Sequence, residues 1–428
     1  MNRREFIKHT AVGVGALALF GPQVVYVQAG EILPKKGKRV VVVGGGFGGA
    51  TAAKYLKMMD PKLDVVLIEE RTEFISCPVS NLVIGGLKEM KEITLSYRTL
   101  AKKYGVNILN ARVLGIDPES RKIETSKGSV AYDRMILSPG IDFMYENVKG
   151  MDEAAQKLFP HAYKAGEQTV QLQRQLVDMK AGEHIIMSVP EAPYRCPPGP
   201  YERTCMIASY LKKNKPGSKI IVLDANPDVV SKGKLFKAAW KDYYEGIIEY
   251  KQEVEIKEIN ADSRSVITSA GEFKGAVLNI IPDQKAGKMA YMGGLTPQGK
   301  RWTPVSALSF ESAIHKDIHI IGDATDGDVI GTLPKSGFVA SSMGKAAAAS
   351  VLAMLAGKEP LAPYLANTCY SMVDERQAIY VTAVFEFDPQ TKKLAGKKAA
   401  GGVSPGRSVR LGLQAEDWAK SIWSDVLG

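Results

Sequence analysis

Residues 40–49 read VVVVGGGFGG, and the fold of the chain follows from this stretch. A helix-compatible run continues to about Met59, and a second apolar segment, residues 65–68, ends on Glu69. A strand, a glycine turn, a helix and a parallel strand within about 30 residues form the unit that binds dinucleotides. A glycine pattern alone is also compatible with an ordinary tight turn, but the complete unit favours dinucleotide binding.

Each glycine of the turn has a separate physical role. Gly44 permits the tight turn, Gly46 lets the backbone approach a pyrophosphate, and Gly49 lets the helix pack closely on the strand. The N-terminus of the helix offers free N–H groups and a positive dipole end to phosphates. Glu69 lies twenty residues after Gly49, where a carboxylate can accept hydrogen bonds from ribose hydroxyls.

The composition is that of an ordinary globular protein, with 45% hydrophobic and 24% charged residues. A length of 428 residues predicts two or three domains. The net charge of +10 comes without a basic run or a basic-aromatic cluster, which favours a solvated basic surface over nucleic-acid binding. The five histidines have no metal-ligand spacing and no Cys-x-x-Cys pair exists, so we expect no metal site.

The first 29 residues are typical of a twin-arginine signal peptide. Arg3 and Arg4 precede an apolar core from Thr10 to Phe20, and residues 27–29 fit a small-residue cleavage site. Eleven apolar residues cannot span the roughly 30 Å of a bilayer core. We therefore expect export to the periplasm, and no later segment reads as transmembrane.

A second strand–helix–strand unit is predicted from the strand 184–189, the helix 200–214 and the strand 219–224. Its connecting turn, residues 190–200, is rich in proline where a nicotinamide-binding relative would have glycine. Proline has no N–H to offer a phosphate. The scaffold is therefore expected without a nicotinamide site.

Further segments are typical of flavoproteins of the glutathione-reductase type. A strand over 132–137 leads to a small-residue turn with Gly140, and the buried strand 318–321 ends in Gly322 and Asp323. In this class the aspartate binds the ribityl chain of FAD, although it could also cap a helix or turn. The predicted helix 336–355 follows Lys335, and its N-terminus, with Ser336 and Gly337, could stabilise negative charge at the flavin.

Over nearly the whole chain after the signal peptide, the sequence resembles the flavoprotein subunit of flavocytochrome c sulfide dehydrogenase. The resemblance rests on residues 40–55, 76–77, 80–81, 160–167, 194–203, 282–287, 318–324, 334–337 and 367–371. The run Arg-Cys-Pro-Pro-Gly-Pro-Tyr-Glu, residues 195–202, is unusual and therefore specific. The implied fold is α/β, with two Rossmann-like domains of the glutathione-reductase type and a C-terminal interface domain.

The implied organisation is a FAD-binding domain over 30–145 and 283–358, a second Rossmann-like domain over 146–282 and an interface domain over 359–428. The implied activity is oxidation of sulfide to sulfur or polysulfide, with FAD passing electrons to a separate c-type cytochrome subunit in a heterodimer. No stable membrane insertion is expected. Two rival functions stay open: a sulfide:quinone oxidoreductase, and an electron-transfer flavoprotein that does not oxidise sulfide.

The resemblance also implies roles for particular residues. Cys196 and Cys369 would form the redox-active disulfide that sulfide attacks, and Cys77 would hold FAD through a thioether. Glu202 matches an active-site acid or base, or a carboxylate that only stabilises a helix N-terminus, and Trp418 matches an aromatic near the active site. Three pairings of four cysteines are possible, and Cys205 could pair with Cys196 instead. Because Cys196 precedes a helix and lies near arginines, we expect its thiolate to be favoured.

Overall fold

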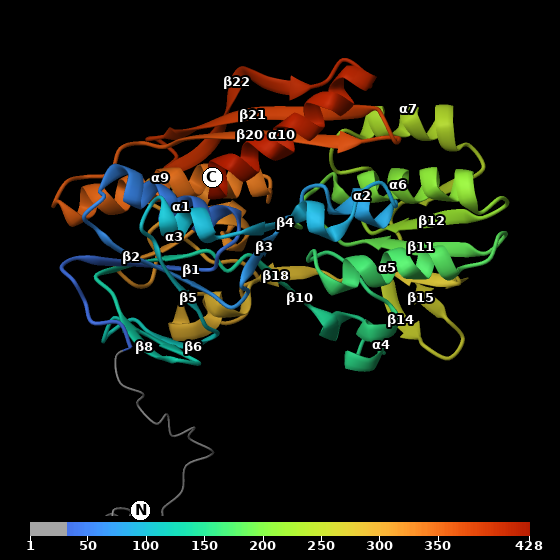
Figure 1. Cartoon of the computed structure of the whole chain (residues 1–428). Coiled ribbons are helices and arrows are strands. Elements are labelled where there is room, and N and C mark those ends of the chain that lie inside the picture. Colours follow the sequence, from blue (N-terminus) through green and yellow to red (C-terminus); the bar gives the residue numbers. More distant parts are fainter. Residues whose placement is uncertain (1–31) are drawn as a thin grey trace, which may run out of the picture.

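A computed structural model describes residues 32–428, and Figure 1 shows two parallel sheets side by side beneath a long antiparallel sheet. The predicted signal peptide, residues 1–29, lies outside the described residues. The α/β class predicted from the sequence is confirmed by both parallel sheets, and the exact domain boundaries stay a prediction.

The first sheet has five parallel strands in the order β19-β9-β1-β2-β5. The strands are β1 Arg39–Val43, β2 Asp64–Glu69, β5 Asn107–Asn110, β9 Arg134–Leu137 and β19 Ile318–Ile320. The four valines of β1 are completely buried because both faces of the sheet are covered, which explains a continuous apolar run instead of an alternating one. β1 has β2 on one side and β9 on the other, so the strand order reverses there and leaves a crevice for a ligand.

Two helices pack together beside this sheet, α1 (Phe47–Met59) and α9 (Gly337–Leu355). Their contact is close, because a Cβ on Gly344 of α9 would lie 2.4 Å from the Gly48 carbonyl oxygen. By length and composition alone, α9 is the one helix among residues 32–428 that could cross a membrane. Half of it is buried, against α1 and the later strand β20 (Tyr364–Met372), which is the packing of a core helix.

The second sheet has four parallel strands in the order β13-β12-β11-β17. The strands are β11 His184–Val189, β12 Lys219–Asp224, β13 Ile248–Lys251 and β17 Val277–Asn279, with helices α5 Glu167–Asp178, α6 Gly199–Asn214 and α7 Gly233–Tyr244. The predicted strand–helix–strand unit is thereby confirmed. A short antiparallel pair, β10 (Ile141–Phe143) with β18 (Gln284–Ala286), links the two halves of the molecule.

Two small antiparallel sheets and a short helix complete the two halves. These are β6 Val113–Asp117, β7 Lys122–Thr125 and β8 Gly128–Ala131 in one half, and β14 Ile256–Asn260, β15 Ser265–Thr268, β16 Gly271–Lys274 and α4 Glu153–Leu158 in the other.

The C-terminal segment lies across both halves (Figure 1). It forms the antiparallel sheet β20-β21-β22, with β21 at Ala378–Asp388 and β22 at Lys393–Val403, followed by helix α10 (Val409–Leu427). Ile422 and Val426 of α10 are buried, whereas Trp418 is only partly buried. A Cβ on Gly412 would lie 1.9 Å from the Arg376 carbonyl oxygen, so α10 can dock here only with glycine at this position.

Residues 92–104 read as helical in the sequence, and this prediction is wrong. Residues 92–104 form the end of a 3-10 helix (Met90–Ile93), the strand β4 (Thr94–Ser96) and the short helix α3 (Arg98–Lys102). β4 pairs with β3 (Glu73–Ile75), because its extended backbone completes a two-stranded ladder. This ladder fixes the start of the loop that carries Cys77 into helix α2 (Ser80–Ile84).

Candidate functional site

The glycine turn after β1 forms a cradle without side chains. Gly44 has φ +92°, and a Cβ there would lie 2.4 Å from the Ser138 carbonyl oxygen. A Cβ on Gly49 would lie 1.9 Å from the Gly44 carbonyl oxygen, so the helix packs on the turn as predicted. Gly46, in contrast, faces open space, with nothing within 4 Å of its Cβ position. As the N-cap of α1 it offers no side chain to the first N–H groups of the helix, which leaves them available to a phosphate.

Glu69 lies beside this cradle at the end of β2. Its two carboxylate oxygens accept hydrogen bonds from the backbone N–H of Gly45 (2.6 Å) and of Arg71 (2.9 Å). Each oxygen keeps a further lone pair that could accept a ribose hydroxyl. The position agrees with the ribose-binding role expected from the sequence.

Gly140 and Gly322 follow the neighbouring strands at the same edge of the sheet, both with positive φ. Next to Gly322, burial raises the pKa of the Asp323 carboxyl, while Arg195 and Lys335 lower it. Asp323 Oδ1 is buried and has no hydrogen-bond partner among residues 32–428. A buried polar atom without a partner needs a ligand, and a ribityl hydroxyl would supply it.

Lys335 connects the nucleotide side of the site to Cys196. Its Nζ donates to the carbonyl oxygens of Asp323 and Thr325, both at 2.8 Å, and lies 3.6 Å from the centroid of the Trp302 ring. Burial lowers the pKa of Lys335 to about 8. Its carbonyl oxygen accepts the Cys196 N–H at 2.6 Å. Ser336 caps α9 by accepting the Val339 N–H at 3.1 Å. Taken together, the glycine cradle, the Glu69 carboxylate and the unpartnered Asp323 oxygen fit FAD.

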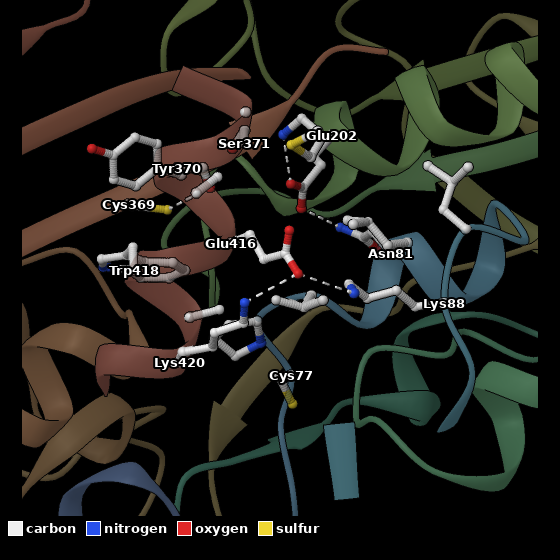
Figure 2. A pocket seen from close by; sticks show the side chains of 18 of the residues that line it. Cys77, Asn81, Lys88, Glu202, Cys369, Tyr370, Ser371, Glu416, Trp418 and Lys420 are labelled. Carbon is white, nitrogen blue, oxygen red and sulfur yellow. Dashed lines mark hydrogen bonds and ion pairs between the residues drawn. The ribbon is translucent and has the colours of Figure 1, made fainter. Parts of the chain in front are cut away.

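A cavity of about 850 Å³ adjoins this region and is lined by all four residues predicted to be catalytic. Cys196, Cys369, Glu202, Trp418 and Cys77 all line it, together with Ser336 and Gly337 at the N-terminus of α9. Figure 2 shows Cys77 on the loop before α2, Glu202 on α6, Cys369 on β20 and Trp418 on α10. The more distant nucleotide-binding residues, including Gly44, Gly46, Gly49 and Glu69, lie outside the cavity lining.

All four cysteines carry free thiols in this structure, so the predicted Cys196–Cys369 disulfide is not formed here. Cys369 Sγ instead lies 3.6 Å from the Tyr370 carbonyl oxygen. Cys205 lies away from the cavity, completely buried, and accepts the indole N–H of Trp240 at 3.3 Å. Cys196 therefore has Cys369, and not Cys205, as its neighbour in the cavity.

Cys196 is held in a strained conformation. Its φ of +54° lies in the left-handed region, which costs a residue with a side chain roughly 1–2 kcal/mol. Hydrogen bonds on both sides maintain it: the Cys196 carbonyl oxygen accepts the Gly199 N–H at 2.7 Å and the Tyr163 hydroxyl at 3.0 Å. Such strain is characteristic of functional sites.

The expectation that the Cys196 thiolate is favoured is wrong. Burial raises the pKa of the Cys196 thiol well above its usual value, Cys369 and Glu202 raise it further, and Arg195 and Lys232 only partly oppose them. Arg203, which was expected to help, turns away: its guanidinium donates to Asn81 Oδ1 (3.1 Å) and to the His161 and Ala162 carbonyl oxygens. Burial also raises the pKa of Cys369, and Lys232 lowers it.

Glu202 connects three elements around the cavity (Figure 2). One oxygen accepts the Asn81 side-chain N–H from α2 at 2.8 Å, and the other accepts the Met372 backbone N–H from β20 at 2.9 Å. Burial raises the pKa of Glu202, while the bonds from Asn81 and Met372 lower it. This geometry is equally compatible with Glu202 as a proton donor and with Glu202 as a structural link between α2, α6 and β20.

Two groups at this site were not predicted from the sequence. Asn81 orients Glu202, and Lys232, which precedes α7, donates from Nζ to Ser371 Oγ at 2.8 Å and to the Cys369 carbonyl oxygen at 3.2 Å. Asn81 was noted only within a matching stretch, and Lys232 lies in a short polar run that no motif marks. Only the folded chain brings them to the cysteines.

Comparisons with protein families match three parts of the chain. Residues 169–282 match the model described as "Sulfide dehydrogenase [flavocytochrome c] flavoprotein chain, central". Residues 361–427 match "Flavocytochrome c sulphide dehydrogenase, flavin-binding", and residues 38–185 match "Pyridine nucleotide-disulphide oxidoreductase".

Individual relatives agree with these matches. The sulfide dehydrogenase flavoprotein chain of Chlorobaculum thiosulfatiphilum is 63% identical over 46 residues, which cover 11% of this chain and 96% of that sequence. The sulfide-quinone reductase of Aquifex aeolicus is 26% identical over 179 residues, 41% of this chain, and the match spans only 40% of that protein's length. The solved structure of the sulfide:quinone oxidoreductase from Aquifex aeolicus has a TM-score of 0.71 at 19% identity and covers 91% of each chain, which shows a shared fold.

Proposed function

The chain belongs to the flavoprotein chains of flavocytochrome c sulfide dehydrogenase, an oxidoreductase family, and we propose that it oxidises sulfide at the Cys196–Cys369 pair and passes the electrons through FAD to a c-type cytochrome. The observation that carries the proposal is the cavity itself. It holds the two cysteines, the Glu202 carboxyl, Cys77 and the N-terminus of α9 in one lining.

The proposed first step occurs at a disulfide between Cys196 and Cys369. Hydrosulfide attacks Cys369 Sγ, so a new S–S bond forms to the substrate sulfur and the bond to Cys196 breaks. The substrate sulfur is oxidised from −2 to −1, and the Cys196 sulfur is reduced by the same amount and leaves with the electron pair. Cys369 then carries the persulfide. Because burial raises the pKa of Cys196, its leaving sulfur takes up a proton, which Glu202 is placed to supply.

FAD, when bound, would accept two electrons from the reduced sulfur. The residues proposed to hold it are those of the glycine cradle, Glu69, Gly140, Gly322, Asp323, Lys335, Ser336 and Gly337, with Cys77 as a covalent attachment. Trp418 is proposed to cover the cavity: its ring lies 6.0 Å from the Tyr370 ring and it lines the wall.

A nicotinamide coenzyme is not proposed as the electron acceptor, because the equivalent place in the second sheet is filled. Tyr201 of α6 is completely buried and donates its hydroxyl to Asp224 Oδ2 at 2.8 Å. Tyr250 donates to the same oxygen at 2.9 Å, and Asn226 donates to the other at 2.8 Å. In related folds the acid at this position, here Asp224 at the end of β12, would bind a coenzyme ribose. Its carboxylate oxygens already accept hydrogen bonds from protein side chains.

The proposed cytochrome acceptor and periplasmic location rest on the family and on the predicted signal peptide. Quinone reduction is the alternative that the Aquifex relative supports. Purified protein loaded with FAD should be mixed with sulfide in a stopped-flow instrument while flavin bleaching is followed, and cytochrome c, a soluble ubiquinone analogue and NAD⁺ should be compared as acceptors.

We expect sulfide to bleach the flavin, and cytochrome c to restore its colour faster than the quinone analogue. Cys369→Ser should keep FAD and lose bleaching, whereas Cys205→Ala, outside the cavity, should retain it. Bleaching by sulfide in Cys369→Ser at the normal rate would exclude the disulfide mechanism. Faster reoxidation by the quinone would favour the alternative function.

A further inference from the structure

Lys232 is a buried cation directly behind the cysteine pair. Only 7% of its surface is exposed, and its Nζ donates to Ser371 Oγ at 2.8 Å and to the Cys369 carbonyl oxygen at 3.2 Å. Its backbone has φ +58° at the N-cap of α7, a conformation that a residue with a side chain rarely adopts. Both the position and the direction of the side chain are therefore fixed toward β20.

The charge of Lys232 has no ordinary structural partner. Within residues 32–428, no carboxylate forms an ion pair with its Nζ, although burying an unpaired charge is costly. Burial lowers the pKa of Lys232, and three titratable groups that face it raise it: Cys369 on β20, Glu202 on α6 and Cys196 in the turn before α6. The Phe236 ring on α7 adds only a weak contact, at 5.9 Å. All three titratable neighbours line the cavity.

We propose that Lys232 is an anion-positioning residue, whose ammonium draws hydrosulfide to Cys369 and stabilises the negative charge of the persulfide formed there. This inference rests on the proposed function. It adds a reason why the substrate attacks one sulfur of the pair and not the other, because Lys232 donates to the backbone carbonyl of Cys369, whereas the backbone of Cys196 is bonded to the Lys335 carbonyl oxygen and the Tyr163 hydroxyl.

The chemistry of the step is unchanged by Lys232 and balances without it. One S–S bond breaks and one forms. When the departing Cys196 sulfur takes its proton from Glu202, the negative charge passes to that carboxylate, and a proton returned from the persulfide to Glu202 moves the charge to the persulfide. The ammonium supplies no electron and transfers no atom. It lowers the free energy of an anion beside Cys369, because opposite charges attract more strongly near buried groups than in bulk water.

The test compares Lys232→Met, Lys232→Arg and the control Lys234→Met, which removes an exposed charge two residues away on the same helix. The first measurement is the second-order rate constant for flavin bleaching by sulfide across pH. We expect Lys232→Met to lower it by about tenfold or more, which corresponds to about 1.4 kcal/mol, and Lys232→Arg to restore most of it. Lys234→Met should match the wild type.

The second measurement identifies the attacked sulfur. Protein treated with one equivalent of sulfide is trapped with an alkylating reagent, and the persulfide is located by peptide mass spectrometry. We expect it on Cys369 in the wild type and distributed over both cysteines in Lys232→Met, which a merely structural role would not produce. Thermal unfolding should show no loss of stability, because methionine removes a buried unpaired charge.

The possible outcomes distinguish a failure of the proposed sulfide oxidation from a failure of the role proposed for Lys232. Absence of bleaching in the wild type contradicts the proposed function. Normal bleaching in Lys232→Met, with the persulfide still confined to Cys369, overturns the role of Lys232 alone. Where Lys232→Met fails to fold, the uncharged variant Lys232→Gln carries the test, and an unchanged bleaching rate in Lys232→Gln with the persulfide still confined to Cys369 would equally overturn the inference.

Discussion

Glu202→Gln is the substitution that best distinguishes a catalytic role of Glu202 as a proton donor from a purely structural role. Glutamine keeps the size of the side chain but offers only one acceptor oxygen, whereas Glu202 accepts from both Asn81 and Met372. Asn81 cannot turn its amide to compensate, because its Nδ2 also donates to the Gly199 carbonyl oxygen and its Oδ1 accepts from Arg203. One donor therefore loses its partner.

The expected magnitudes differ for the two roles. A buried donor without a partner costs about 1–3 kcal/mol of stability. Loss of a general acid lowers a rate by about 100- to 10,000-fold. If the role of Glu202 is only structural, Glu202→Gln should lower the melting temperature, and the folded variant should bleach within a few-fold of the wild-type rate. A proton donor would add a far larger loss of rate.

The pH dependence gives a second criterion. Burial raises the pKa of Glu202 above the ordinary 4.5, so the folded state binds its proton more tightly than the unfolded state does. Stability from this group is present below the ordinary pKa and is lost as pH rises through the raised value. Since glutamine does not titrate, the stability difference between wild type and Glu202→Gln should shrink as pH increases.

The assay combines stopped-flow bleaching by sulfide with denaturant unfolding, each across a pH series. The matched control is Glu375→Gln, a carboxylate at the same cavity whose side chain is 40% exposed and whose loss should change stability by no more than about 0.5 kcal/mol. A Glu202→Gln variant that bleaches within threefold of the wild-type rate at every pH would refute the acid role assigned to Glu202.

Three further predictions follow from the same geometry. Cys77→Ser should still bind FAD but release it on acid precipitation, whereas the wild-type pellet should stay yellow; a colourless wild-type pellet would refute the covalent link. Gly49→Ala should purify without FAD, as judged by absorbance, because the new Cβ would lie 1.9 Å from the Gly44 carbonyl oxygen, while Gly396→Ala, exposed on β22 with open space at its Cβ position, should keep the cofactor. NADH should leave the flavin oxidised in stopped-flow mixing, because Asp224 is already occupied by Tyr201 and Tyr250, and rapid reduction would contradict this assignment.

The nucleotide-binding half could be predicted from the sequence because its signals are local. A buried strand, three glycines and an acid twenty residues on depend on neighbours in the chain, and the structure keeps each of them in the expected place. The helix expected over 92–104 failed for the opposite reason. Residues 94–96 form the strand β4 because they pair with β3, which lies about twenty residues earlier. A local sequence pattern does not show this pairing.

The electrostatics of the cysteine pair could not be predicted from local sequence. Cys196 precedes a helix and follows an arginine, a pattern that favours a thiolate when the sulfur is exposed. In the folded protein Arg203 is committed to Asn81 and to backbone carbonyls, and burial decides the direction of the pKa. Lys232 lowers the pKa of both thiols against the effect of burial, and it lies at the N-cap of α7, distant from both cysteines in the sequence.

The raised thiol pKa values set a requirement on any chemistry at this pair. Opening a disulfide with hydrosulfide leaves a negative charge on one sulfur, and burial disfavours that charge at Cys196 and at Cys369 alike. Two groups can offset the cost by different means, Glu202 in the cavity wall with a proton and Lys232 behind β20 with the charge of its ammonium group. A buried disulfide without such an acid and cation would be hard for hydrosulfide to open. At an exposed disulfide, water would stabilise the new charge and neither group would be needed. The combination of buried cysteines with one acid and one unpaired cation therefore fits a site where charge is created during the reaction and must be removed before the next turnover.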